Sequence, residues 1–248
     1  MALTVDLNAD MGEGIGQDAL LLDVVTSANI CCGLHAGSPQ VMADTMEAAM
    51  KRGVGIGAHP GFDDRANFGR TRMTLGTVDL ASLIRYQVGA AKAVADGLGT
   101  RLDHLKLHGA MANMATEDVA FAETAFRAAL QVAPEMKLMV IAATAQQTAA
   151  EKLGVSFIGE IFADRAYNDD ATLVDRRLEG AVIHDAEFAS SRVLAMLEAG
   201  AIISASGTHI PTRIDTVCLH GDTAEALEMA RTLLTRLTEA GVVIQRAK

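Results

Sequence analysis

The sequence predicts an α/β protein folded as a closed (β/α) barrel, seven-stranded and distorted, in a single domain spanning residues 1–248. Short β-type runs alternate with longer helical runs along the chain, which is typical of a parallel sheet with right-handed crossovers. Hydrophobic residues make up 50% of the chain, enough for one large core. Polar side chains end successive strands from the start of the chain to its end, and a closed barrel brings all those ends to one rim.

The strands are predicted from short apolar runs. From Leu3 to Asp10, apolar and polar residues alternate with a period of two, which indicates a strand with two different faces. Six more strands are expected at Ser27–Cys32, Val54–His59, Leu105–His108, Leu138–Ala142, Val155–Phe162 and Thr216–His220. The runs 201–204 and 208–213 flank a Ser-Gly pair and indicate a hairpin outside the barrel.

The helices are predicted from capping residues and helical periodicity. Ser38 and Pro39 suit the cap and first position of a helix that ends near Gly53. Further helices are expected at Asp79–Gly97, Glu117–Gln131, Ala145–Leu153, Ala186–Glu198 and Thr223–Ala240. Two long polar loops, 60–75 and 164–177, leave the predicted barrel rim.

Composition excludes several classes of function. The formal net charge of -10 argues against nucleic acid and anionic membranes as partners. Three cysteines (Cys31, Cys32 and Cys218) lie inside apolar runs, so free thiols in a reducing cytoplasm are expected. The first residues lack the basic and apolar regions of a signal peptide, and no apolar run approaches the roughly 20 residues of a membrane helix.

The first predicted strand carries the strongest functional signal. Asp6, Asn8 and Asp10 are two residues apart, so their side chains share one face, which is the interior of a barrel. Buried carboxylates are costly unless they are paired or bind a metal, and two close carboxylates suit an acid/base pair. Glu13 follows in a glycine-rich turn and can return to the same mouth. The alternative is a solvated strand with capping roles.

The second and third strands end in imidazoles. Cys32 and His35 have a spacing that can ligate zinc, but no second pair exists, and core packing is favoured for Cys31 and Cys32. His35 and His59 are expected at the site, where His59 suits a general base or a metal ligand. The candidate metal ligands are Asp10, His35 and His59. Neighbouring polar groups at these two strand ends are Asn29 and Asp63.

The glycine-rich segments do not match a nucleotide motif. Glycines at positions 53, 55 and 57 allow close packing but lack the spacing of a dinucleotide fingerprint, and no phosphate-binding loop motif occurs. Arg70 and Arg72 add positive charge to the following loop, which suits a carboxylate or phosphate. For Arg72, a solvated ion pair is an equal alternative.

Later strand ends add a lysine and further polar groups. Lys106 and His108 are two apart and are expected to face the same side, where an inward lysine can hold a carboxylate or an oxyanion. Asn113 is expected in the loop that follows, and His104 is expected at the opposite, structural rim. Arg165 suits an anion clamp. His220 and Asp222 end the last strand, while His184 and His209 are interpreted as structural.

Six ordered segments give the chain a close resemblance to the LamB/YcsF family. They are LTVDLNADMGEG, SANICCGLHAG, GAHPGFDDRANFGR, LKLHGAMAN, FADRAY and LHGD, and together they extend over essentially the whole chain. The resemblance implies a seven-stranded barrel similar to the glycoside hydrolase/deacetylase superfamily. It also implies that the chain is the A component of an ATP-hydrolysing 5-oxoprolinase, which opens the lactam 5-oxo-L-proline to L-glutamate together with the 5-oxoprolinase subunits B and C.

The sequence departs from that family in two places. The family commonly has Asp after HAG, where this chain has Ser38, and reads KPHGALYN where this chain has Leu107, Met111 and Ala112. These changes leave Lys106 and His108 in place. They bear on the choice of lactam more than on the class of reaction.

The resemblance and the clusters together define the expected site. Proton transfer is expected from the catalytic set Asp6, Asp10, Glu13, His59, Lys106 and His108. Substrate binding is expected from Asn8, Asn29, His35, Asp63, Arg70, Asn113, Arg165, His220 and Asp222. The expected cofactor is ATP with Mg²⁺, either on this chain or on a partner, and a bound divalent metal is left open. Two alternatives remain, a metal-dependent deacetylase or amidohydrolase and a non-catalytic substrate-binding subunit.

Overall fold

Seven parallel strands close into a barrel in the computed structural model, which describes residues 3–14, 17–219 and 224–247. They are β1 (Thr4–Met11), β2 (Ser27–Cys31), β3 (Gly55–His59), β4 (His104–Leu105), β5 (Lys137–Ile141), β6 (Phe157–Phe162) and β9 (Thr216–Leu219). Neighbours follow that order, and β1 pairs with β9 to close the sheet. The predicted fold class is confirmed.

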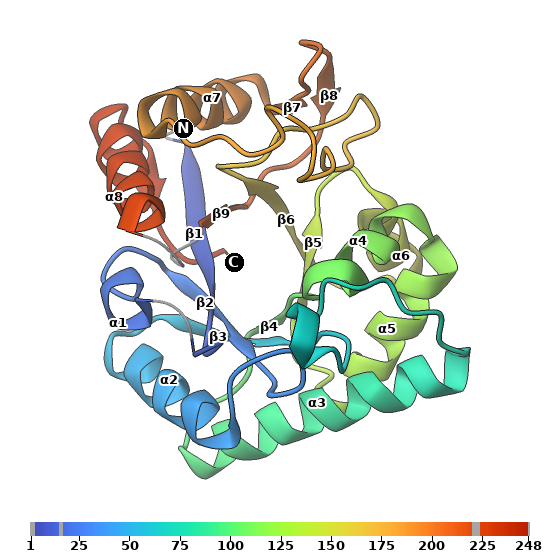
Figure 1. The fold of residues 1–248 in the computed structure, drawn as a ribbon. Helices are drawn as coiled ribbons and strands as arrows, with labels where there is room; N and C mark the ends of the chain where they lie inside the picture. The colour runs from blue at the N-terminus through green and yellow to red at the C-terminus, as the bar shows by residue number, and fades with distance from the viewer. Residues whose placement is uncertain (1–2, 15–16, 220–223, 248) are drawn as a thin grey trace.

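Helices surround the strands, and a hairpin projects from the barrel (Figure 1). The helices are α1 (Asp18–Leu21), α2 (Pro39–Lys51), α3 (Thr77–Gly97), α4 (Gly109–Glu117), α5 (Val119–Val132), α6 (Ala145–Leu153), α7 (Ala186–Ala199) and α8 (Ala224–Glu239), with a 3₁₀ turn η1 at Arg65–Asn67. The hairpin pairs β7 (Ala201–Ile203) with β8 (His209–Pro211), and β10 (Val243–Ile244) adds to the start of β1.

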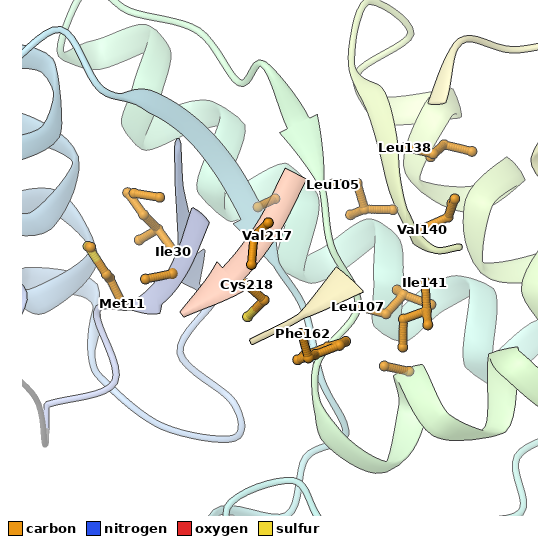
Figure 2. Close-up of a cluster of buried hydrophobic side chains, with 14 of the residues drawn as sticks. Met11, Ile30, Leu105, Leu107, Leu138, Val140, Ile141, Phe162, Val217 and Cys218 are labelled. Atoms are coloured by element: carbon orange, nitrogen blue, oxygen red, sulfur yellow. The ribbon is translucent and has the colours of Figure 1, made fainter. Parts of the chain in front are cut away.

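The barrel wall separates an apolar layer from a polar interior. Leu7, Ala9 and Met11 alternate with the polar residues of β1 and are fully buried, on the face that a period of two assigns to the helices. Met11 is in register with Ile30 on β2, and Figure 2 shows these two side chains next to each other in the apolar cluster. The other face of β1 therefore carries its polar side chains toward the barrel axis.

The structure differs from the prediction at several helices and strands, and for the helix predicted at Glu117–Gln131 the cause is a capping residue. The helix predicted at Glu117–Gln131 begins at Val119, because Asp118 caps it by accepting hydrogen bonds from the backbone N–H groups of Ala120 and Phe121. Residues 109–117 form α4 instead of a loop, although no side chain caps this helix and it begins with glycine, a poor helix former. The short elements α1 and β10 were not predicted.

The fourth strand is shorter than predicted but keeps its direction. It ends at Leu105, yet the backbone N–H groups of Lys106 and His108 still donate to the carbonyl oxygens of Ala58 and Pro60, at 3.0 and 2.9 Å. These bonds carry the segment onward beside the end of β3. They bring Lys106 and His108 to the barrel mouth, as the sequence predicts.

Within the described residues, no helix is long and apolar enough to span a membrane. Cys31, Cys32 and Cys218 are free and buried. Burial raises the pKa of the Cys31 thiol to about 12, so this thiol is neutral and serves as a packing residue.

Candidate functional site

A pocket of about 690 Å³ opens at the carboxyl ends of the strands. Acidic and imidazole groups line its floor, and arginines lie at its edge. Eight of the predicted site residues line it, namely Asp10, Glu13, His59, Arg70, Lys106, His108, Asn113 and Arg165. The location matches the usual position of active sites in (β/α) barrels.

Asp10 connects the groups of the pocket floor. Its Oδ1 accepts hydrogen bonds from Asn29 Nδ2 at 2.9 Å and from Lys106 Nζ at 3.0 Å. Its Oδ2 lies 3.3 Å from His59 Nε2. The side chain is 16% exposed, so the carboxylate is held by three partners and still reaches the pocket.

Lys106 lies between two carboxylates and a thiol. Its Nζ is 2.7 Å from Glu160 Oε1, 3.0 Å from Asp10 Oδ1 and 3.0 Å from Cys218 Sγ. The contact between Lys106 Nζ and Glu160 Oε1 is an ion pair without the angles of a hydrogen bond. Burial lowers the pKa of Lys106, but Asp10, Cys218 and Glu160 together outweigh burial, and the pKa is raised well above 10.5. The lysine is therefore a permanent cation.

Glu160 is a member of this floor that the sequence analysis missed. It is fully buried on β6 and lines the pocket. A signal was present, because Glu160 is the only charged residue in the run Phe157–Phe162, and a charge inside a buried strand needs a partner. Lys106 is that partner, two strands away around the barrel.

His59 is held in one tautomer by the backbone. Its Nδ1 donates to the Lys106 carbonyl oxygen at 2.8 Å, and its Nε2 faces both Asp10 and His108 Nδ1, the latter at 3.0 Å. Burial lowers the pKa of His59, but the Asp10 carboxylate more than offsets it, so the pKa is raised above 6.5. His59 is therefore protonated more readily than a free imidazole, with Asp10 beside it as counter-ion.

His35 and His108 stack face to face beside His59. Their ring centroids are 3.7 Å apart with an interplanar angle of 2°. Glu13 Oε1 lies 3.2 Å from His35 Nε2 and 3.5 Å from His108 Nδ1. Burial and the neighbouring His59 lower the pKa of both rings to about 3. At neutral pH both imidazoles are therefore uncharged, and each ring has one N–H that can donate a hydrogen bond and one nitrogen that can accept one.

A lower polar layer supports the floor from inside the barrel. Asp6 accepts hydrogen bonds from Thr26 Oγ1 at 2.5 Å, Ser27 Oγ at 2.8 Å and Thr216 Oγ1 at 2.5 Å. Burial raises the pKa of Asp6 despite these three hydroxyls. Asp6 is fully buried and does not line the pocket, so its contacts support a role in joining β1, β2 and β9.

Asn8 and Asn29 form the layer between Asp6 and Asp10. Asn29 Nδ2 donates to Asn8 Oδ1 at 2.7 Å as well as to Asp10. Asn29 Oδ1 accepts from His104 Nε2 at 2.7 Å. His104 was expected at the structural rim, and it lies buried inside the barrel at the start of β4. The two asparagines are outside the pocket lining and position the carboxylate of Asp10.

The remaining predicted residues lie at the edge of the pocket or beyond it. Arg70 stacks over the Phe68 ring at 5.1 Å, and Asn113 lines the pocket from α4. Arg165 is only 5% exposed and donates to the carbonyl oxygens of Val174 and Ala181, so it fastens the loop that covers the pocket. Asp63 is exposed and does not line the pocket. His220 and Asp222 lie outside the described residues.

Four side chains could hold a metal ion, three that line the pocket and the fully buried His35, which does not line it. Glu13, His35, His59 and His108 each offer one ligand atom, and these atoms lie within 4.8 Å of one another. Of the predicted metal ligands, His35 and His59 belong to this group. Asp10 is outside it and contacts it through His59.

Comparison with known proteins identifies relatives over the whole chain. The model of the LamB/YcsF family matches residues 5–248. A protein of Ruegeria pomeroyi named as the A component of 5-oxoprolinase is 54% identical over 245 residues, covering 97% of each chain. A Gluconobacter oxydans protein of the same name is 43% identical over 249 residues, covering 98% of each.

Solved structures agree with the fold. The crystal structure of a lactam utilization protein from Thermus thermophilus superposes with a TM-score of 0.91 at 35% identity, covering 98% of this chain and 99% of that one. A putative cellobiose-phosphate cleavage protein from Enterococcus faecalis has a TM-score of 0.58 at 14% identity, covering 99% and 98%. The second similarity concerns the fold alone.

Proposed function

Because the chain belongs to the LamB/YcsF family, we propose that it is the lactam-opening A component of an ATP-dependent 5-oxoprolinase, which converts 5-oxo-L-proline to L-glutamate. Two relatives with this name support the proposal, since their alignments with this chain cover 97% and 98% of their length. The observation that carries it is the group formed by Asp10, His59 and Lys106 on the pocket floor. A carboxylate, a proton carrier and a fixed cation are what amide hydrolysis requires.

The chemistry requires water addition and nitrogen protonation. The water oxygen bonds to the lactam carbonyl carbon, the ring C–N bond breaks, and the departing nitrogen takes up a proton. Asp10 and Glu13 are carboxylates that reach the pocket and can accept a proton from the water. His59 can return a proton to the nitrogen. Its pKa is raised, because Asp10 outweighs the effect of burial. Lys106 supplies a positive charge for the oxygen that becomes negative.

ATP would activate the lactam, since an unstrained amide is a poor electrophile. We propose that phosphorylation of the lactam oxygen takes place on the partner subunits B and C, where ATP and Mg²⁺ would bind. Water addition and C–N cleavage would then leave a γ-carboxyl phosphate, and a second water would hydrolyse it to glutamate and inorganic phosphate. The sequence of this chain has no phosphate-binding loop. The pocket floor carries the carboxylates Asp10, Glu13 and Glu160, which would repel a triphosphate. The arginines at the pocket edge, Arg70 among them, suit the smaller charge of a carboxylate or a single phosphoryl group.

The test reconstitutes the complex of all three subunits and measures glutamate release and ATP hydrolysis separately, with 5-oxo-L-proline as substrate. Asp10→Asn and Glu13→Gln should each lower glutamate release by roughly 10²–10⁴-fold, while lactam-dependent ATP hydrolysis persists. The matched control is His209→Gln on the exposed hairpin, which should retain both rates.

Three results would contradict parts of the proposal. Full glutamate release by both variants would remove the floor from catalysis and favour a substrate-binding subunit without chemistry of its own. Equal loss of ATP hydrolysis and glutamate release would move activation onto this chain. Glutamate release by this chain alone from 5-oxo-L-proline without ATP would favour an ordinary amidohydrolase.

A further inference from the structure

Two imidazole nitrogens face each other on the pocket floor with no hydrogen bound to either when both rings are neutral. His59 Nδ1 and His108 Nε2 each lie 2.8 Å from a backbone carbonyl oxygen, of Lys106 and Phe68 respectively. A carbonyl oxygen only accepts hydrogen bonds, so both of these nitrogens carry their hydrogens. In the neutral rings, the opposite nitrogens, His59 Nε2 and His108 Nδ1, therefore present lone pairs. A protonated His59 would instead direct its Nε2–H toward Asp10 Oδ2 or His108 Nδ1.

These two lone pairs are 3.0 Å apart. At that distance they repel unless they share a cation, which is either a proton or a metal ion. His35 and Glu13 extend the same group, because Glu13 Oε1 lies 3.2 Å from His35 Nε2 and 3.5 Å from His108 Nδ1. Three imidazoles, each at most 5% exposed, and one carboxylate thus lie in one region. His35 is stacked parallel to His108, so one of these two rings must tilt for both to direct lone pairs at one ion.

We propose that this group, made of His35, His59, His108 and Glu13, is a binding site for one divalent transition-metal ion of the zinc type. Two donors bound to one such ion at about 2.0–2.1 Å lie roughly 2.8–3.0 Å apart in octahedral geometry and roughly 3.3–3.4 Å apart in tetrahedral geometry. Three of the separations, 3.0, 3.2 and 3.5 Å, lie in or just above that range, and all four donor atoms lie within 4.8 Å of one another. Imidazole nitrogen with one carboxylate favours zinc and its neighbours over magnesium or calcium.

The surroundings hold the ligands as a metal site requires. Metal-binding histidines usually donate their second ring N–H to a carbonyl or carboxylate, which fixes the tautomer and the ring orientation. His59 and His108 both do so through backbone carbonyls. Asp10 Oδ2 lies 3.3 Å from His59 Nε2 and adds negative charge beside the site. Gly61 and Gly69 pack against the stacked rings, since a Cβ on either would come within 2.9 Å of His35 or His108.

The site shares Glu13 and His59 with the proposed lactam hydrolysis. With an ion bound, these two side chains would be ligands, and Asp10 would be the carboxylate left to accept a proton from water. A shared proton accounts for the contact between His59 and His108 alone. It does not involve His35. Metal binding, in contrast, should depend on His35 and Glu13 as well.

The test uses the full chain after removal of metals by a chelator, titrated with Co²⁺ alone. We expect one Co²⁺ per chain, detected by the visible absorption of a low-symmetry Co²⁺ centre and displaced by Zn²⁺. His108→Gln, His35→Gln and Glu13→Gln should each weaken Co²⁺ binding by more than the roughly 10–100-fold that loss of an outer partner costs. The matched control, His209→Gln, should bind Co²⁺ like the unaltered protein.

Circular dichroism of each variant separates loss of a ligand from loss of the fold. If a histidine variant fails to fold, Glu13→Gln decides, because this side chain is at the pocket surface. Absence of stoichiometric Co²⁺ binding would overturn the proposal, and so would binding that His35→Gln and Glu13→Gln leave unchanged. Since the measurement does not involve the lactam or ATP, failure here leaves the proposed 5-oxoprolinase activity standing, and failure of that activity leaves this site standing.

Discussion

Lys106 Nζ lies 2.7 Å from Glu160 Oε1, and this ion pair connects the end of β4 with β6 across the intervening strand β5. Both side chains are buried. A buried ion pair adds little stability relative to apolar packing, but removal of one partner leaves an uncompensated charge. The pair therefore sets the arrangement of the pocket floor more than it adds to the free energy of unfolding.

The first prediction concerns this pair. Lys106→Met should lower the free energy of unfolding by about 3–5 kcal/mol, because Glu160 and Asp10 then lose their shared cation. Adding Glu160→Gln to Lys106→Met should recover about 1–3 kcal/mol of that loss. The measurement is a double-mutant cycle, with urea unfolding of the unaltered protein, the two single variants and the double variant. Strictly additive losses would show that the two side chains do not interact.

The second prediction concerns stability in acid. Burial lowers the pKa of His104 from 6.5 to about 3, so the folded protein keeps this ring neutral while the unfolded chain takes up a proton below about pH 6.5. The stability from this residue is complete above pH 6.5, and it falls toward pH 3 by up to about 1.4 kcal/mol per pH unit.

His104→Gln should therefore make the pH dependence of the unfolding free energy shallower by about one proton between pH 6.5 and pH 3. Glutamine keeps an N–H that can donate to Asn29. The measurement is urea unfolding of metal-free protein across that range, with exposed His209→Gln as the control. Identical slopes for His104→Gln and the unaltered protein would rule out a neutral buried His104.

The third prediction concerns a close approach inside the barrel. A Cβ at Gly57 would lie 2.1 Å from His104 Nε2, so Gly57→Ala should displace the ring that holds Asn29 and cost about 1–3 kcal/mol. The control is Gly97→Ala at the end of α3, where nothing lies within 4 Å of the new Cβ. That change should be neutral or stabilise by up to about 1 kcal/mol. Equal thermal unfolding of the two variants would contradict the prediction.

The fourth prediction concerns the loop over the pocket. Arg165 donates to the carbonyl oxygens of Val174 and Ala181, and a lysine has no second arm to reach both. Arg165→Lys should speed hydrogen exchange of the amides in residues 166–182 by roughly tenfold, about one lost hydrogen bond. It should also raise KM for the lactam more than it changes kcat. Unchanged exchange together with an unchanged KM would show that Arg165 does not fasten this loop.

Much of the barrel follows from patterns that are local in the sequence. The alternation in Leu3–Asp10 predicts an inward row of polar side chains, and Asp6, Asn8 and Asp10 form that row. Polar groups that end successive strands meet at one pocket, because parallel strands in a closed barrel share a carboxyl rim. The structure confirms the predicted count of seven barrel strands. The count could be predicted because each strand is a separate apolar run in the sequence.

The parts that escaped prediction depend on contacts across the barrel. Glu160 pairs with Lys106 from two strands away, and no spacing in the sequence encodes that register. Asp6 and Asp10 look alike along the strand, yet three hydroxyls enclose Asp6 while Asp10 reaches the pocket. The tautomers of His59 and His108 are set by backbone carbonyls, which a sequence cannot position.

Closure of the barrel by β1 and β9 has a consequence for the order of folding. Asp6 takes two of its hydroxyl partners from residues 26 and 27 and the third from Thr216, and Lys106 contacts Cys218. During synthesis on the ribosome, the first strand must therefore wait for nearly the entire chain before its carboxylates are fully enclosed. Such dependence on contacts far apart in sequence slows folding. The unfinished chain exposes apolar surface and unpaired strand edges of its unclosed sheet, and such intermediates are prone to aggregate.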